Sequence, residues 1–433
     1  MLEDRARPSR RRFPPRPSSV RDARRMIHDC LLAAGRADLV ETAELLVSEI
    51  VTNALVHAGT PIEVAFSFVD GGLRVEVTDG SPHEPARRGY GPNAGTGRGL
   101  MLLEEMVDEW GVVPDDPGKT VWFQIASRAA PDQRSPGPSA HPRGAEDAVT
   151  VELLGVPLLL HEAWRQHAES LLREYLLASL DLDPAEDPIV VHAQASDAIA
   201  LLAEHIPESG VGGAPEQVMV AATEPFVTCP RVEMPVPLRS VHNFATLERA
   251  MSAALDLADD GSFLTPSTQP ELQVLRAWLC DQVLSQSTGA EPAPWSPMDE
   301  PRPGHVGTLA WDASAVTLAS TGMVAADHHD RIVAVSPAAL ELLGYDDPQD
   351  LLGARLTAII PQRYRQAHLA GFTMHFLSGR SLLVGRTIVV PALRGDGSEV
   401  EVELTIGTDR AEDGRTMFVA GLAPATQVAP PHP

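Results

Sequence analysis

The sequence predicts an α+β protein built from three modules, and three observations lead to this prediction. The chain has 433 residues, of which 44% are hydrophobic, enough to build two or three globular cores. Two stretches rich in Pro, Ser and Gly interrupt it, at 129–145 and 287–307. Elsewhere, runs with helical periodicity alternate with runs of strand periodicity. The predicted modules are therefore residues 13–127, 149–286 and 311–422.

The first module combines helices with strands that lie on both sides of a glycine-rich stretch. Its predicted elements are a helix after Ser18 and Ser19, a helix over 38–58, strands over 62–68 and 73–77, a helix over 100–109 and a strand over 121–125. Asp70-Gly71-Gly72 supplies the turn between the first two strands. We expect an α/β sandwich, in which a mixed sheet is covered by helices on one face.

The second module is predicted to be a mainly helical α/β region, and the third an antiparallel sheet with helices. In the second we expect strands over 149–156 and 189–191 and helices over 161–179, 196–205, 244–258 and 270–285. In the third we expect strands over 322–326 and 332–336, short helices, and three more strands within 382–422. Asp396-Gly397 and Asp413-Gly414 mark the hairpin turns of these last strands.

Charge and composition narrow the classes of partner. The formal net charge of −25 argues against direct binding of DNA, because phosphate repels such a surface. No apolar stretch approaches 18 residues and no signal peptide is visible, so we expect a cytoplasmic protein without a membrane partner. Three scattered cysteines show neither a zinc spacing nor a disulfide framework. The only lysine, Lys119, stands against 33 arginines and receives no role from the sequence.

Polar residues on the second predicted helix are the first candidates for a functional site. Glu49 and Asn53 lie four residues apart, so they share one face of the helix. An amide oxygen is a suitable ligand for Mg²⁺, and a carboxylate can accept a proton from a hydroxyl group. Taken alone, two polar residues on a solvated helix face explain the pair equally well.

Two further elements strengthen the case for a nucleotide site. Asp79 ends an apolar strand, where its carboxylate could accept a hydrogen bond from a base. Residues 95–100, Gly-Thr-Gly-Arg-Gly-Leu, open a predicted helix, so their backbone N–H groups are suited to bind an anion such as a triphosphate. This glycine run lacks the context of a Rossmann motif and the spacing of a P-loop.

The order of these elements resembles the N, G1 and G2 boxes of the GHKL ATPase superfamily. The segments SEIVTNALVHA, VTDGSP, TGRGL and GKTVWF resemble in particular its anti-sigma-factor serine kinases, over essentially the whole first module. The resemblance implies that ATP and Mg²⁺ bind here, with Asn53 on the metal, Glu49 as general base and Asp79 on adenine. Residues Gly95, Thr96, Gly97, Arg98, Gly99 and Leu100 would hold the phosphates, and Ser81–Ala94 would form a lid.

The same resemblance suggests what the ATP is used for. About 37 residues precede the predicted helix over 38–58, too few for the phosphorylated helical hairpin of a histidine kinase together with the first strand and helix of the module. The resemblance therefore implies a serine/threonine kinase that acts on an anti-anti-sigma protein of the STAS fold and so regulates transcription. The alternative is a binding module that holds ATP and sequesters a sigma factor or its antagonist without turnover. In the G1 box, Pro82 replaces a glycine of the histidine kinases, which predicts a shorter and stiffer lid.

The third module resembles a PAS domain over nearly its whole length. The segments GMVAADHHDRIVAVSPAALELLGY and RGDGSEVEVEL carry the resemblance, which implies a pocket for a small ligand or a surface for a homodimer. His368 lies in YRQAH, which resembles the haem-binding segment of oxygen-sensing PAS domains. Ile388 stands where those sensors have an arginine, so an ordinary helix residue is the favoured interpretation of His368. The second module contains no recognisable catalytic group.

Overall fold

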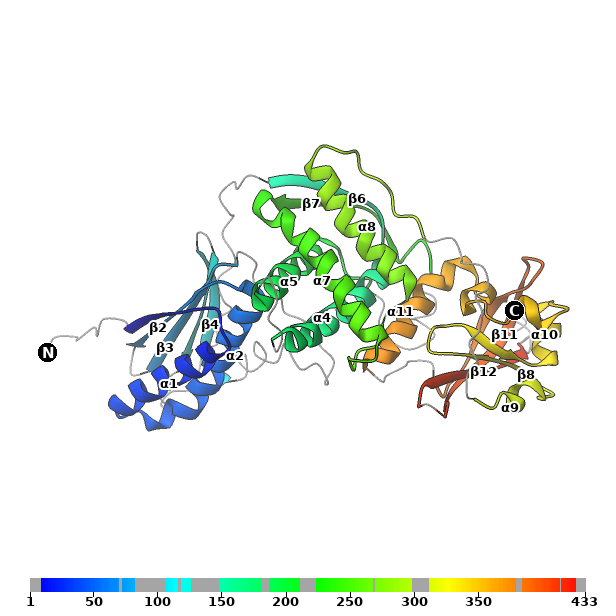
Figure 1. The fold of residues 1–433 in the computed structure, drawn as a ribbon, viewed down its shortest axis with the longest axis horizontal. Helices are drawn as coiled ribbons and strands as arrows, with labels where there is room; N and C mark the ends of the chain where they lie inside the picture. Colours follow the sequence, from blue (N-terminus) through cyan, green and yellow to red (C-terminus); the bar gives the residue numbers. More distant parts are fainter. Residues whose placement is uncertain are drawn as a thin grey trace, which may run out of the picture.

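Each predicted module contains its own sheet in the computed structural model. Figure 1 shows the three groups of elements in sequence along the long axis, from the N-terminal group through the middle one to the C-terminal one. The structure describes residues 9–69, 72–81, 106–115, 118–125, 148–180, 187–210, 223–267, 269–297, 311–378, 384–412 and 414–425.

The N-terminal sheet has five strands in the order β1-β2-β3-β5-β4. These are β1 (Ser9–Phe13), β2 (Ile62–Val69), β3 (Gly72–Asp79), β4 (Glu109–Asp115) and β5 (Gly118–Ile125). Every neighbouring pair is antiparallel, so the prediction of a mixed sheet was wrong. Short connections require this direction for β2–β3 and for β4–β5, because parallel neighbours need a long crossover.

Strand β4 was missed by the sequence analysis. The predicted helix over 100–109 ended within it, since Glu109 already pairs with Gln124 of β5. Acidic and apolar residues follow one another here in an order that also fits a helix, so periodicity could not mark the boundary. Residues 100–105, the start of that predicted helix, lie outside the described residues.

Helices α1 (Ser18–Ala33) and α2 (Val40–Ala58) cover one face of this sheet, as Figure 1 shows. The alternating residues Leu73, Val75 and Val77 of β3 are fully buried on that face, among apolar side chains of α2. Helix α2 is followed by Gly59, whose φ of 57° is the left-handed conformation that glycine adopts readily.

The middle region, which we call the connector, packs helices against a two-stranded sheet. Strand β6 (Ala148–Pro157) pairs with β7 (Thr228–Pro237), and the helices are α4 (Leu158–Ser179), α5 (Pro188–His205), α7 (Val241–Asp259) and α8 (Pro270–Ser287). The sequence analysis missed β7, whose prolines argue against a central strand. A two-stranded sheet has only edge strands, where missing N–H donors are tolerated.

The strand predicted over 189–191 was also wrong, because these residues form the first turn of α5. The Asp187 carboxylate accepts a hydrogen bond from the backbone N–H of Ile189, and Pro188 occupies the start of the helix. An acidic N-cap followed by proline is a strong helix-start signal. It outweighs the β-branched run that suggested a strand.

The C-terminal sheet confirms the predicted strands and hairpin turns closely. Its antiparallel strands are β8 (Gly322–Ala326), β9 (Ile332–Val335), β10 (Thr387–Leu393), β11 (Glu399–Arg410) and β12 (Thr416–Pro424), in the order β10-β11-β12-β8-β9. Helix α10 (Pro337–Leu343) is capped by Ser336, whose hydroxyl accepts from the Ala339 N–H.

Helix α11 (Gln362–Ser378) lies between the connector and the C-terminal sheet, as Figure 1 shows. It packs against α4, and its residues Leu369 and Ala370 belong to the buried core of the connector. The Gln366 side-chain oxygen accepts a hydrogen bond of 2.8 Å from the Leu159 backbone. The third module therefore contributes a helix to the core of the second.

Candidate nucleotide site

Helix α2 carries Glu49 and Asn53 one turn apart, and both side chains are half-buried. The fully buried neighbours Val47 and Val51 turn toward the sheet, which leaves Glu49 and Asn53 at the flank of the packed face. This position combines a fixed backbone with side chains that solvent or a ligand can reach. The shared helix face expected from the sequence is therefore present.

Asp79 is the last residue of β3 and continues its buried row. Val75, Val77 and Asp79 alternate along the strand on the face that α2 covers, and Asp79 is only 4% exposed. The carboxylate and the two polar residues of α2 therefore lie on the same side of the sheet. A buried carboxylate at a strand end is unusual, and it requires partners that compensate for the lost water.

Lys119 supplies one such partner from the neighbouring strand. It stands directly opposite Asp79 in the β3–β5 register, and its Nζ lies 3.0 Å from Asp79 Oδ1. Lys119 is itself 6% exposed, so the ion pair is buried. Burial raises the pKa of Asp79, and the nearby Lys119 ammonium opposes that rise.

A tight turn after β3 supplies the second partner. The Ser81 backbone N–H donates to Asp79 Oδ1 at 2.8 Å. The Gly80 N–H donates to Thr60 Oγ1, also at 2.8 Å, which ties this turn to the end of α2. The hydrogen bonds from Ser81 and Lys119 thus go to the same carboxylate oxygen, Asp79 Oδ1. Because Oδ1 is held by these two bonds, the orientation of the second carboxylate oxygen, Oδ2, is fixed as well.

The glycine run expected to hold phosphates, Gly95, Thr96, Gly97, Arg98, Gly99 and Leu100, lies outside the described residues, as do residues 82–94 of the expected lid. Among the expected site residues, the structure describes Glu49, Asn53, Asp79 and Ser81. They come from one helix and one strand end on the same face of the sheet.

Sequence reasoning missed Lys119 and Thr60. A signal for Lys119 existed, because it is the single lysine beside 33 arginines and it lies at the start of an apolar strand. An ammonium group is a compact donor that fits a small buried space better than a guanidinium. Thr60 carried no such signal, because its partner Gly80 is brought near only by folding.

His368, considered above as a haem ligand, binds a carboxylate. Its Nε2 donates to Asp330 Oδ1 at 2.7 Å, and Asp330 is fully buried in the turn between β8 and β9. The nitrogen that could serve as an axial ligand is thus occupied by a hydrogen bond in this structure. His368 acts here as a residue of helix α11 that holds the turn.

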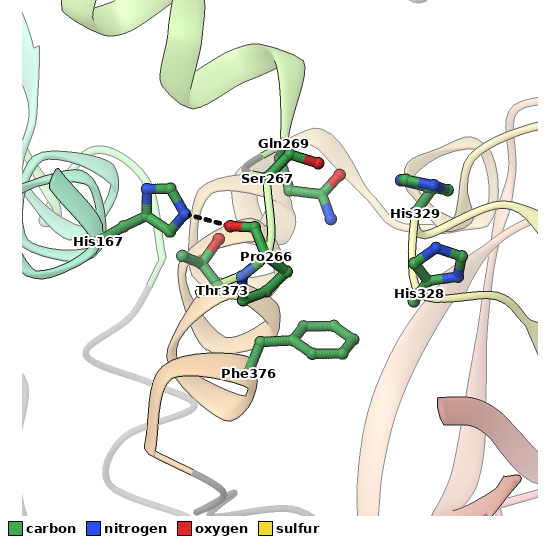
Figure 2. Close-up of a pocket in the computed structure, with 8 residues that line it drawn as sticks. All are labelled: His167, Pro266, Ser267, Gln269, His328, His329, Thr373 and Phe376. Atoms are coloured by element: carbon green, nitrogen blue, oxygen red, sulfur yellow. Dashed lines mark hydrogen bonds between the residues drawn. The ribbon is translucent and has the colours of Figure 1, made fainter. Parts of the chain in front are cut away.

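A small cavity lies beside this turn, between the connector and α11. Figure 2 shows His328 and His329 on one side and Pro266 and Phe376 on the other. On the far side of Pro266, His167 Nε2 donates to its carbonyl oxygen at 2.7 Å. The cavity volume of about 40 Å³ has room for a few water molecules.

Comparison with known families agrees with this architecture. Residues 13–125 match the histidine kinase-like ATPase domain, and residues 313–374 match the PAS domain. The chain thus carries an ATPase domain of the histidine kinase-like type at its N-terminus and a PAS domain at its C-terminus. This combination indicates an ATP-binding signalling protein.

A curated relative matches over a short stretch. An uncharacterized protein of Azorhizobium caulinodans is 35% identical over 99 residues, which are 23% of this chain and 13% of that protein. The chain therefore spans a small part of the length of this relative.

Solved structures of PAS and LOV domains are similar to part of this chain. The PAS domain of an HTR-like protein from Haloarcula marismortui is 23% identical, over 26% of this chain and 86% of that one, with a TM-score of 0.20. The LOV protein of Rhodobacter sphaeroides is 15% identical, over 27% and 65%, with a TM-score of 0.22. The PAS domain of the fruit-fly ELK potassium channel is 14% identical, over 25% and 88%, with a TM-score of 0.21.

No group of three or more His, Cys, Asp or Glu side chains that could hold a metal ion occurs among the described residues. In the same part of the chain, no helix combines the length and the apolar character that crossing a bilayer requires.

Proposed function

We propose that this protein is a serine/threonine kinase that transfers the γ-phosphoryl group of ATP to a STAS-type anti-anti-sigma partner, under the control of its PAS domain. The observation that carries the proposal is the placement of Glu49 and Asn53 one turn apart on α2. They lie on the same side of the sheet as the buried carboxylate of Asp79.

The side chains of Asp79 and Asn53 have the chemistry needed to bind adenine and Mg²⁺. The Asp79 carboxylate at the strand end can accept a hydrogen bond from the exocyclic amino group of adenine, and its burial favours that bond over water. The Asn53 side-chain oxygen is a hard donor of the kind that Mg²⁺ prefers, and Mg²⁺ takes most of its other ligands from phosphates and water. Bound Mg²⁺ would neutralise charge on the phosphates.

Glu49 can serve the transfer step as a proton acceptor. The partner's serine oxygen forms a bond to the γ-phosphorus as the bond to the ADP oxygen breaks, and Glu49 takes the hydroxyl proton. ADP leaves with the bridging oxygen and its charge. Half-burial keeps the Glu49 carboxylate within reach of a partner's hydroxyl group while α2 fixes its position.

The proposal is tested by incubating the full chain with γ-labelled ATP, Mg²⁺ and a purified STAS-domain protein. We expect wild type to label a serine or threonine, and Glu49→Gln to lower the rate by about 10²–10⁴-fold, because a general base contributes that much. Glu41→Gln is the matched control, since Glu41 is exposed at the start of the same helix and should leave the rate unchanged.

Binding measured in parallel separates the two candidate functions. Calorimetry with a non-hydrolysable ATP analogue should show binding to wild type and to Glu49→Gln. Nucleotide binding with no labelling of any tested partner would favour the sequestering module over the kinase. Because Asp79→Asn leaves Lys119 buried without its counter-ion, Asp79→Asn/Lys119→Met is the better variant to test loss of binding.

A further inference from the structure

Helix α5 of the connector packs against α2, the helix that carries Glu49 and Asn53 (Figure 1). The two helices approach each other closely at Gly59, immediately after the end of α2. A Cβ atom on Gly59 would lie 2.6 Å from Cβ of Ala193 and 3.4 Å from the carbonyl oxygen of Ile189. The first distance is shorter than real Cβ contacts allow, so a glycine is required for α5 to lie this close.

The α5 residues at this contact do not belong to the connector's own core. Ile189 and Ala193 are buried, at 8% and 3% exposure, yet neither is part of the connector's hydrophobic cluster. That cluster uses Ala198 and Leu202 of the same helix instead. Helix α5 thus has two buried faces, of which one stabilises the connector and the other meets the ATPase domain.

Only a few covalent and hydrogen bonds separate this contact from Asp79, the residue proposed to bind adenine. Thr60, the residue after Gly59, accepts the 2.8 Å hydrogen bond from the Gly80 N–H. Gly80 also packs closely on the Thr60 methyl group, since a Cβ on Gly80 would lie 2.8 Å from Thr60 Cγ2. Gly80 follows Asp79 directly, so the position of Thr60 constrains the turn that orients the Asp79 carboxylate.

We propose that α5 is a positioning element of the nucleotide site, acting through Gly59 and Thr60 on the turn Asp79–Ser81. The proposal rests on the nucleotide binding proposed above and assigns its regulation to the connector. With α5 docked, Thr60 holds the turn in the conformation that binds adenine. With α5 displaced, the turn loosens and the affinity for nucleotide falls by roughly 5- to 150-fold, the usual range of coupling between sites.

The first test alters the hydrogen bond that joins the two segments. In the full chain, Thr60→Val removes the acceptor for Gly80 and Thr60→Ser retains it. We expect Thr60→Val to weaken binding of an ATP analogue at least about fivefold, and to speed amide hydrogen exchange in a peptide covering residues 78–81 without nucleotide. Thr60→Ser should resemble wild type in both measurements. Equal affinity and exchange in Thr60→Val and wild type would overturn the proposal.

The second test displaces α5 by a substitution in the connector, so that no residue of the ATPase domain is changed. Ala193→Leu places a larger side chain against Gly59, and the same change at Ala178, exposed on α4, is the matched control. We expect Ala193→Leu to reproduce the loss of affinity and the faster exchange at 78–81, and Ala178→Leu to change neither. Unchanged exchange in Ala193→Leu contradicts the positioning role.

The two readouts keep this inference separate from the proposed function. If wild type binds no ATP analogue, the proposed function fails, and exchange at residues 78–81 still decides whether α5 positions the turn. If wild type binds the analogue and both Thr60→Val and Ala193→Leu bind it equally well, α5 has no positioning role although the nucleotide site stands.

Discussion

The connector holds three buried histidines, His161, His167 and His192, and burial lowers the pKa of each. The pKa of His161 falls to about 3 and that of His192 to about 4. His192 Nδ1 still donates to the Leu172 carbonyl, whereas His161 Nε2 has no hydrogen-bond partner. All three rings are therefore neutral parts of the core at neutral pH.

This burial makes the connector sensitive to acid. In the unfolded chain these histidines bind protons as the pH falls through about 6.5, whereas in the folded chain His192 does so near 4 and His161 near 3. Protonation thus favours the unfolded state, and His161 and His192 each lower the free energy of unfolding by about 1.4 kcal/mol for each pH unit between 6.5 and 4.

We expect His161→Phe to reduce this loss by about 1.4 kcal/mol per pH unit, because the ring then carries no titrating group. Urea unfolding at several pH values, followed by tryptophan fluorescence, measures it. Trp164, whose ring lies 5.7 Å from that of His161, reports on this core. His205→Phe, half-exposed at the end of α5, is the control. An identical pH slope in His161→Phe and wild type would falsify the assignment.

At the scale of elements, one buried arginine joins the PAS turn to the connector. Arg355 donates to Asp330 at 3.2 Å, to Glu271 at 3.1 Å and to Gln269 at 2.8 Å. Asp330 also accepts from His368 of α11. Asp330 sits in the left-handed conformation at φ 65°, which an aspartate adopts more readily than most residues. This network fixes the β8–β9 turn against the start of α8.

Arg355→Met should destabilise this junction by about 3–5 kcal/mol, because it removes the cation that pairs with the fully buried Asp330 carboxylate and the partly buried Glu271 carboxylate. Arg363→Met is the matched control. Arg363 pairs with Glu399 on the surface, where an ion pair contributes at most about 1 kcal/mol. Urea unfolding of both variants compares them, and equal stabilities would show that the buried network contributes no more than the surface pair.

The PAS domain and the ATPase domain are joined to the connector by different kinds of contact. The PAS helix α11 supplies Leu369 and Ala370 to the connector core, so the two regions share buried surface. The ATPase domain meets the connector through the contact of α2 with α5. Helix α4 packs against both α11 and α5, and therefore lies on a continuous path between the PAS and ATPase domains.

We expect calorimetry of the full chain to show one transition for the PAS domain and connector together and another for the ATPase domain. An ATP analogue with Mg²⁺ should raise the ATPase transition, since ligand at 100 times its Kd stabilises a domain by about 2.7 kcal/mol. The Asp79→Asn/Lys119→Met chain should lack that rise. A PAS transition separate from that of the connector would contradict the shared core.

Local patterns determined much of what the sequence predicted correctly. Apolar and polar residues alternate at the start of β11, and the turns before and after it carry Asp-Gly, so short-range chemistry placed this part of the PAS sheet. The spacing of Glu49 and Asn53 placed them on one helix face in the same way. Where local signals conflicted, as at β4, at β7 and at the start of α5, the prediction failed, because packing and edge position decided the outcome.

Sequence patterns alone indicated the helix that carries Glu49 and Asn53, the strand that ends at Asp79 and the C-terminal PAS domain. Only the tertiary structure placed Lys119 against Asp79, Thr60 against Gly80, and α5 against Gly59. Each of these contacts joins residues 20 or more positions apart, or two different domains. Such contacts depend on how strands register and helices dock, which no local periodicity encodes.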